Sequence, residues 1–326
     1  MRRKMDNLDR FGRRITYLRI SVTDRCNFRC IYCMPPGGVP WRPHAEILRY
    51  EEIVRLVRAA ATLGIRKVRL TGGEPLVRKG LPDLVRELSR IPGIEEVVMT
   101  TNGALLSEHA EALARAGLSR VNVSLDTLRP ERFREITRLG RLKDVWEGIR
   151  AAREVGLVPI KLNAVILRGV NEDEVAELAA LARQGFSVRF IEWMPLGSVG
   201  EDFRRRFVPG GEIRARVEEW LGPLVPLRRE GPARVFALPG GGEVGFITAI
   251  SAPFCSSCNR MRVTADGKLR PCLLSPVELD LKGALRAGAS QGELARLLAE
   301  GIQRKPFSHG ATEAVPYDRE MSEIGG

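Results

Sequence analysis

The 326-residue sequence has no apolar run near the roughly 20 residues that a membrane-spanning helix needs. Its N-terminus carries charges but lacks an apolar stretch before a small-residue cleavage site, so it does not match a secretory signal. Histidine is scarce: His44, His109 and His309 fall in no motif, and we expect all three at the surface. These absences argue against a membrane protein and favour the cytoplasm, where six cysteines are more often metal or redox ligands than disulfides.

Negative charge is in short supply, because 40 Asp and Glu stand against 52 Lys and Arg, a net charge of +12 at pH 7. Such an excess suits an anionic partner, which could be nucleic acid, an acidic membrane or a phosphorylated small molecule. The basic residues are mostly arginines spread over amphipathic stretches, which favours a composition bias over a nucleic-acid-binding stripe. With 44% hydrophobic residues, the chain can bury a large core.

Short runs rich in Val, Ile and Leu alternate with amphipathic stretches of helical period over the first 200 residues. The predicted strands cover residues 16–21, 67–71, 97–101, 120–125, 159–165 and 187–193. This βαβα pattern predicts an α/β fold with a parallel sheet, either doubly wound or curved as a barrel. The alternation fails beyond residue 200, so residues 201–326, with a helix predicted near 212–221, are read as a second region.

Basic residues occupy one phase of the period-two alternation in these strands. If the apolar phase packs on helices, the other phase points into the lumen of a barrel, and it contains Arg19, Lys67, Arg69, Lys161 and Arg189. Enclosed cations need anions, because each unpaired buried charge costs several kcal/mol. The lumen is therefore predicted to hold a polyanion such as a triphosphate. The alternative is a half-exposed sheet whose polar face meets water.

The cysteines form two triads. Cys26, Cys30 and Cys33 have the spacing CxxxCxxC just after the first predicted strand. Three thiolates on one loop can hold three irons of a four-iron cluster and leave the fourth open, although zinc completed by His44 or a carboxylate also fits. The second triad is Cys255, Cys258 and, fourteen residues later, Cys272. It suits a second such cluster, with a zinc knuckle and a distant fourth ligand as the alternative.

Several further motifs accompany the triads: Tyr32 before the last cysteine of the first, Gly72-Gly73-Glu74-Pro75, Thr100 to Gly103, Asn122 to Asp126, Arg189 to Met194, CxxCNRxR, and Gly325-Gly326. This set, from Arg19 to Gly326, resembles the GTP 3′,8-cyclase family of the radical S-adenosylmethionine (SAM) superfamily. The resemblance implies an incomplete (β/α)6 TIM-type barrel over residues 1–200. It also implies a C-terminal region, residues 201–326, with an auxiliary cluster and a glycine tail near Arg19.

The resemblance implies site residues as well. Two [4Fe-4S] clusters would be held by Cys26, Cys30 and Cys33 and by Cys255, Cys258 and Cys272. The SAM site would be lined by Tyr32, Gly73, Ser124 and Met194. GTP would contact Arg19, Lys67, Arg69, Thr100, Lys161, Arg189, Arg260, the Met261 backbone and Arg262, with Arg260 and Arg262 also expected to act in catalysis.

The implied reaction is the first step of molybdenum cofactor biosynthesis. A 5′-deoxyadenosyl radical from SAM takes the C3′ hydrogen of GTP, and bond formation at C8 leads to 3′,8-cyclo-7,8-dihydro-GTP. An external electron donor is needed, and the product would pass to cyclic pyranopterin monophosphate synthase. We expect a cytoplasmic monomer or homodimer without nucleic-acid or membrane partners. Another radical SAM enzyme with an auxiliary cluster, acting on a peptide, is the alternative.

Overall fold

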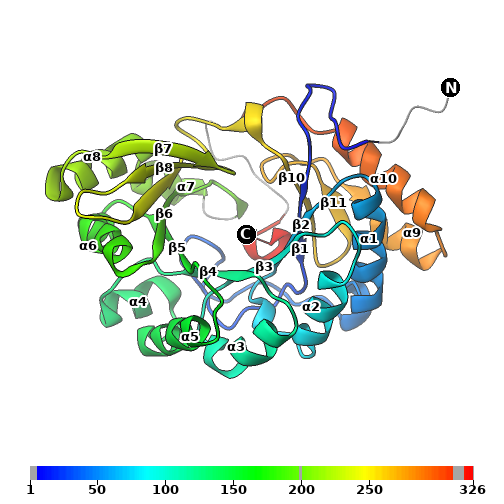
Figure 1. Ribbon diagram of the computed structural model, residues 1–326, viewed down its shortest axis with the longest axis horizontal. Coiled ribbons are helices and arrows are strands. Elements are labelled where there is room, and N and C mark those ends of the chain that lie inside the picture. Colours follow the sequence, from blue (N-terminus) through cyan, green and yellow to red (C-terminus); the bar gives the residue numbers. More distant parts are fainter. Residues whose placement is uncertain (1–5, 198–199, 311–318, 326) are drawn as a thin grey trace.

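A computed structural model describes residues 6–197, 200–310 and 319–325 (Figure 1). Six parallel strands lie side by side in chain order at its centre. They are β1 (Tyr17–Ser21), β2 (Lys67–Thr71), β3 (Glu96–Thr101), β4 (Arg120–Ser124), β5 (Lys161–Ile166) and β6 (Ser187–Glu192). The strands predicted from the sequence are thus confirmed, with ends that differ by at most two residues.

Helices connect these strands and cover the outside of the curved sheet (Figure 1). They are α1 (Tyr50–Thr62), α2 (Leu81–Ser89), α3 (Leu106–Arg115), α4 (Pro130–Thr137), α5 (Leu142–Glu154) and α6 (Val175–Ala180). The apolar phase of the strands packs against them, as in β1 and β2, where Leu18, Ile20, Val68 and Leu70 are fully buried in the main core. Burial of this phase leaves the polar phase on the inner, concave face.

The later part of the chain extends both edges of the same sheet. Beyond β1 lie β10 (Arg260–Val263), which is parallel to β1, then β11 (Lys268–Arg270) and β12 (Leu279–Asp280). Beyond β6 lie β9 (Glu243–Ile247), which is parallel to β6, then β8 (Ala233–Ala237) and β7 (Val225–Glu230). The twelve-stranded sheet runs from β12 to β7 without closing, so the barrel is incomplete, as predicted.

The remaining helices are α7 (Gly200–Arg206), α8 (Gly210–Leu221), α9 (Leu281–Arg286), α10 (Gln291–Gln303) and α11 (Met321–Ile324). The helix predicted near 212–221 is confirmed as α8. The short α11 lies inside the arc of strands rather than outside it (Figure 1). None of the helices in the described ranges is both long and apolar enough to cross a membrane. The division of the chain at residue 200 stays a prediction, since strands from both sides of it share one sheet.

Candidate active site

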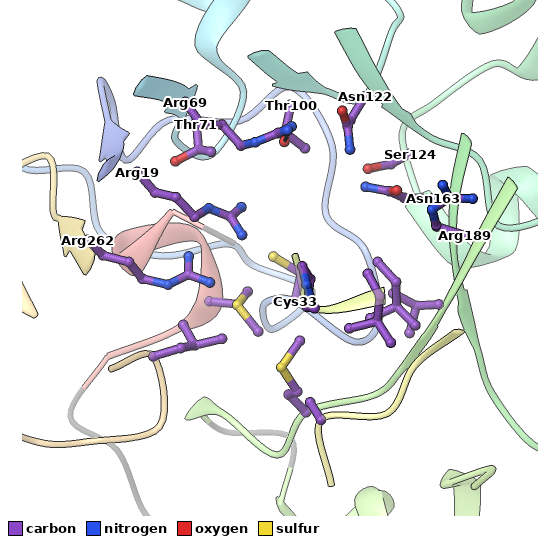
Figure 2. A pocket seen from close by; sticks show the side chains of 18 of the residues that line it. Arg19, Cys33, Arg69, Thr71, Thr100, Asn122, Ser124, Asn163, Arg189 and Arg262 are labelled. Atoms are coloured by element: carbon purple, nitrogen blue, oxygen red, sulfur yellow. Dashed lines mark hydrogen bonds between the residues drawn. The ribbon is translucent and has the colours of Figure 1, made fainter. Parts of the chain in front are cut away.

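The concave face of the sheet encloses a cavity of about 370 Å³, and all six cysteines line it. Side chains from β1, β2 and β10 face side chains from β4, β5 and β6 across this space (Figure 2). A volume of this size is typical of small-molecule sites. The cavity therefore brings together two cysteine triads that are more than 200 residues apart in the sequence.

The first triad lies on the loop that leaves β1. Backbone hydrogen bonds from Arg29 N to Thr137 O and from Ile31 N to Ile136 O, both 2.9 Å, fasten this loop to the end of α4. All three cysteines are free and partly buried. Burial, together with Glu74, raises the pKa of Cys26 to about 11. Burial and neighbouring thiols also raise the pKa values of Cys30 and Cys33. These thiols are neutral near pH 7 unless a metal displaces their protons.

The glycine-rich segment after β2 packs against the start of that loop. A Cβ on Gly73 would lie 2.3 Å from the carbonyl oxygen of Arg25, so only glycine fits. Gly73 N donates to Thr23 O at 2.9 Å, and Glu74 N donates to Arg25 O at 2.8 Å. The absence of a side chain at Gly73 thus allows the two loops to pack closely. Gly73 also lines the cavity.

Glu74 has a structural role rather than direct contact with the cavity. Its buried carboxylate accepts hydrogen bonds from Leu76 N at 3.0 Å, Thr101 Oγ1 at 2.8 Å and Asn102 N at 2.6 Å. Burial raises its pKa to about 7 despite these donors. The residue joins the loops after β2 and β3, which fixes the rim of the site beside the first triad.

The residues predicted for SAM lie in the wall of the cavity, and Met194 packs in a small cluster that also includes Cys272. Tyr32, Gly73, Ser124 and Met194 all line the cavity. Tyr32 is held by its hydroxyl, which donates to Asp126 Oδ2 at 2.7 Å, and by Trp193 Nε1, which donates to its carbonyl at 3.2 Å. Beside Ser124, Asn122 and Asn163 have buried Oδ1 atoms that accept no hydrogen bond from any residue in the described ranges (Figure 2). Buried polar atoms of this kind fit a polar ligand.

Three arginines form a row across neighbouring strands. The parallel register places Arg262 of β10 beside Arg19 of β1, and Arg19 beside Arg69 of β2. Figure 2 shows Arg19 and Arg262 extending side by side into the cavity. Arg69 Nη1 donates to Thr100 Oγ1 at 2.8 Å. Burial and the neighbouring cations lower the pKa of Arg19 to about 9 and lower that of Arg262 as well. An anion between these groups would relieve the repulsion.

The C-terminal segment reaches this row. Arg262 Nη1 donates to the carbonyl oxygen of Gly325 at 2.5 Å. A Cβ on Gly325 would lie 2.5 Å from Thr71 Oγ1, and its φ of +80° favours glycine. The predicted approach of the tail to Arg19 is thus supported at Gly325, while Gly326 lies outside the described residues.

Lys161 and Arg189 make a second cationic group on the opposite wall. Both are buried, and both contact the carboxylate of Glu230, which β7 carries to the cavity; the Arg189 Nη2 to Glu230 Oε2 distance is 2.9 Å. Burial opposes ionisation of Glu230, yet the two cations lower its pKa to about 2. Burial lowers the pKa of Lys161 to about 8 despite Glu230. Glu230 was not among the residues expected in the lumen, because it lies outside the six predicted strands.

Two predicted GTP contacts, Lys67 and the Met261 backbone, are not among the residues that line the cavity. Lys67, the first residue of β2, pairs with Glu96 and lies over the Tyr17 ring, outside the cavity lining. The expectation that it shares the lumen with the other cations needs correction, because it is one layer below Arg69 and has its own carboxylate. The Met261 side chain is buried in the main core, so only its backbone could face a ligand.

The charged groups near the second triad are opposite in sign to the carboxylates near the first triad. Cys255 begins the short helix η6 (Cys255–Ser257), and Cys258 follows it. Burial would raise the pKa of Cys258, but Arg260 and Lys305 outweigh it and lower the pKa to about 6. Burial raises the pKa of Cys272. The second triad thus lies in cationic surroundings.

His309 corrects another expectation. It is not a surface residue, since it lines the cavity, donates from Nε2 to Ala249 O at 2.8 Å and hydrogen-bonds the thiol of Cys255. His44 is exposed, as predicted. A histidine therefore does lie beside the second triad, and only the folded chain brings it there from 51 residues past Cys258.

The donor sets fit iron–sulfur clusters better than single ions. Within the described ranges, no three His, Cys, Asp or Glu side chains are placed to hold one metal ion. A four-iron cluster takes each cysteine on a different iron, so its ligands need not converge on one point. Each triad, with three partly buried free thiols facing a shared cavity, suits such a cluster.

Comparison with known proteins agrees with the assignment of iron–sulfur clusters to the triads. Residues 20–182 match the model of the Radical SAM superfamily, and residues 186–311 match that of Molybdenum Cofactor Synthesis C. The structure of Streptococcus suis SuiB bound to S-adenosylmethionine has the same fold, with a TM-score of 0.60 and 16% identity over 91% of this chain and 66% of that chain. The fold and the first triad thus define a radical SAM protein.

Relatives found by sequence comparison identify the family within this superfamily. A GTP 3′,8-cyclase of Pelotomaculum thermopropionicum is 55% identical over 98% of this chain and 99% of its own length. One of Moorella thermoacetica is 53% identical with the same coverage. The chain belongs to the GTP 3′,8-cyclase family.

Proposed function

We propose that the protein converts GTP to 3′,8-cyclo-7,8-dihydro-GTP, the first step of molybdenum cofactor biosynthesis, with SAM and two [4Fe-4S] clusters. The observation that carries this proposal is a single cavity whose wall contains both cysteine triads and the basic side chains Arg19, Arg69, Lys161, Arg189, Arg260 and Arg262. The identity of 53–55% to GTP 3′,8-cyclases over nearly the full length of the chain supports GTP rather than a peptide as the substrate.

The end of the cavity near the first triad would bind SAM. When bound, the first cluster and SAM supply the radical chemistry that removes the C3′ hydrogen of GTP. The protein's part is to position: Asp126 and Trp193 hold Tyr32 in place. The unpartnered Oδ1 atoms of Asn122 and Asn163 offer acceptors for donors on the ligand.

The basic side chains would hold the triphosphate and guanine of GTP. Arg19, Arg69 and Arg262 offer guanidinium groups in one row, which suits phosphate oxygens. Thr100 and Arg260 also line the cavity within this region. The second cluster would bind the guanine end beside Arg260 and Arg262, which we assign to catalysis through that contact.

A phosphate group would take the place of Glu230 at Lys161 and Arg189. In the ligand-free protein, the Glu230 carboxylate already provides the two cations with the negative charge that a phosphate oxygen would carry. Because the side chain is about one-third exposed, it can turn toward water when GTP enters. Before GTP binds, Glu230 keeps the two buried cations from being unpaired. After GTP binds, its movement toward water removes the repulsion between the carboxylate and the phosphate.

Anaerobic reconstitution tests the proposal. We expect about eight irons and eight sulfides per chain and, with a chemical reductant, SAM and GTP, formation of 5′-deoxyadenosine and the cyclic nucleotide. Zinc without sulfide would exclude radical chemistry, and SAM cleavage with a peptide but not GTP would favour the peptide-modifying alternative. The electron donor in the cell, transfer of product to cyclic pyranopterin monophosphate synthase, and a cytoplasmic monomer or homodimer are further parts of this proposal.

A further inference from the structure

Lys305 is a buried cation beside the second triad. It follows α10, is only 2% exposed and lines the cavity. Its Nζ donates to the carbonyl oxygen of Arg260 at 2.8 Å and to that of Pro271 at 2.7 Å. Arg260 lies two residues after Cys258, and Pro271 immediately precedes Cys272. One ammonium group therefore joins the two chain segments that carry these cysteines.

Within the described part of the chain, the charge of Lys305 has no carboxylate partner. Among the described residues, no Asp or Glu oxygen lies within ion-pair distance of its Nζ, and the two hydrogen-bond acceptors are neutral. A buried ammonium group is costly without a negative partner. The thiols of Cys258 and Cys272 are close enough to interact with this charge. Cysteine ligands of a bound cluster would supply the missing negative charge.

The segment that carries Lys305 is fixed in place by a second buried cation. Arg13 Nη1 donates to Cys255 O at 2.8 Å and to Phe307 O at 3.1 Å, while its Nη2 donates to Pro306 O at 2.7 Å. Asp9 pairs with the Arg13 Nε at 2.6 Å. Arg13 thus has its carboxylate and serves as an anchor, whereas Lys305, together with Arg260, acts on the thiol of Cys258.

We propose that Lys305 is a positioning residue for the second cluster, holding its cysteine segments in register and favouring the cluster's reduced form through its charge. The proposal rests on the second cluster assigned above and concerns a residue that is not a metal ligand. A positive charge beside an iron–sulfur centre stabilises added negative charge, so removing it lowers the reduction potential. The two carbonyl contacts predict an additional loss of cluster retention when the side chain cannot donate.

The experiment compares three variants of the full chain in a background where Cys26, Cys30 and Cys33 are alanine, so that only the second cluster contributes. Lys305→Arg keeps charge and donors, Lys305→Gln keeps a donor without charge, and Lys305→Met keeps neither. Iron and sulfide content, the electron paramagnetic resonance spectrum of the reduced protein and the midpoint potential are measured after anaerobic reconstitution. Lys282→Met is the matched control, because Lys282 Nζ also donates to a carbonyl, Glu46 O at 3.0 Å, but at the protein surface.

We expect Lys305→Arg and Lys282→Met to match the parent in iron content and potential. Lys305→Gln should hold about four irons at a lower midpoint potential, and Lys305→Met should lose part or all of the cluster. Circular dichroism and thermal unfolding of the apo-proteins separate cluster loss from global misfolding. An unchanged midpoint potential in Lys305→Gln, or full iron content with an unchanged spectrum in Lys305→Met, would overturn the proposal.

None of these measurements of iron, sulfide, spectrum and potential uses GTP or SAM, so the result does not depend on turnover. Failure of the cyclase proposal would appear as absence of the cyclic product from a protein that holds both clusters. Failure of the Lys305 proposal would appear as a normal second cluster in its variants.

Discussion

The two cysteine triads line the same cavity but lie in opposite electrostatic surroundings. Carboxylates are close to the first triad. Burial is the main cause of the raised pKa of Cys26, and Glu74 raises it further; burial and Cys33 raise the pKa of Cys30, and Asp126 adds to this effect. Cations are close to the second, where Arg260 and Lys305 lower the pKa of Cys258. The surroundings of the first triad therefore suit a ligand with positive groups, such as the sulfonium and ammonium of SAM, and those of the second suit a nucleotide. Under the proposed function, this difference would orient the two ligands within a single cavity.

The largest effect should come from removing one cysteine from each triad. Cys30→Ala should abolish both SAM cleavage and GTP conversion, whereas Cys258→Ala should keep SAM cleavage and lose cyclisation by about 10³-fold or more, as when one member of a catalytic unit is removed. Quantifying 5′-deoxyadenosine and the cyclic nucleotide by mass spectrometry separates the two. Cyclisation by Cys258→Ala at a rate near that of the parent would erase the division between the ends.

Arg69→Ala should weaken GTP binding without changing SAM binding. A lost charged hydrogen bond costs about 1.5–3 kcal/mol, or roughly 10- to 150-fold in Kd. Lys67→Ala should cost less, because Glu96 already pairs with Lys67. Calorimetric titration with each ligand measures both constants. Equal losses for SAM and GTP would mean that Arg69 supports the whole cavity rather than its anionic end.

Glu230→Gln should tighten GTP binding by about 3- to 10-fold, since the triphosphate no longer competes with a carboxylate for Lys161 and Arg189. SAM binding should not change. Glu212→Gln is the control, because Glu212 pairs with Arg168 at 2.7 Å on the surface. Weaker GTP binding by Glu230→Gln would show instead that the carboxylate positions Lys161 for the substrate.

The smallest effect is a pH dependence confined to GTP. The pKa of Lys161 is about 8, since burial and the cations Arg189 and Arg120 outweigh Glu230. Its ammonium is therefore charged below pH 8 and loses its proton above it, so GTP affinity should fall by roughly 3- to 10-fold from pH 7 to pH 9. Lys161→Arg should remove this slope. A SAM affinity that follows the same slope would assign the titration to another group.

The inner face of β1, β2, β5 and β6 could be predicted because period-two alternation is local: Arg19, Arg69, Lys161 and Arg189 all line the cavity. Local alternation could not predict the neighbours of these residues. Arg262 was expected at the site only from the family resemblance, because it lies beside Arg19 through the pairing of β10 with β1, and the two residues are 243 positions apart in the sequence. The stretches that contain Glu230, Lys305 and His309 lack strand periodicity, so local patterns did not predict that these side chains line the site. The packing role of Gly73 was hidden for the same reason, since it depends on the loop at Arg25.

The contact between Gly325 and Arg262 has a consequence for biosynthesis of the protein. A nascent chain that has emerged as far as β6 already carries the first triad, but the edge of β1 is still bare and the contacts of Arg262 and Gly325 are not yet made. The wall that β10 and Gly325 add to the cavity is therefore complete only after the chain has been synthesised as far as residue 325, so both edges of the sheet must be present before the site has its final shape.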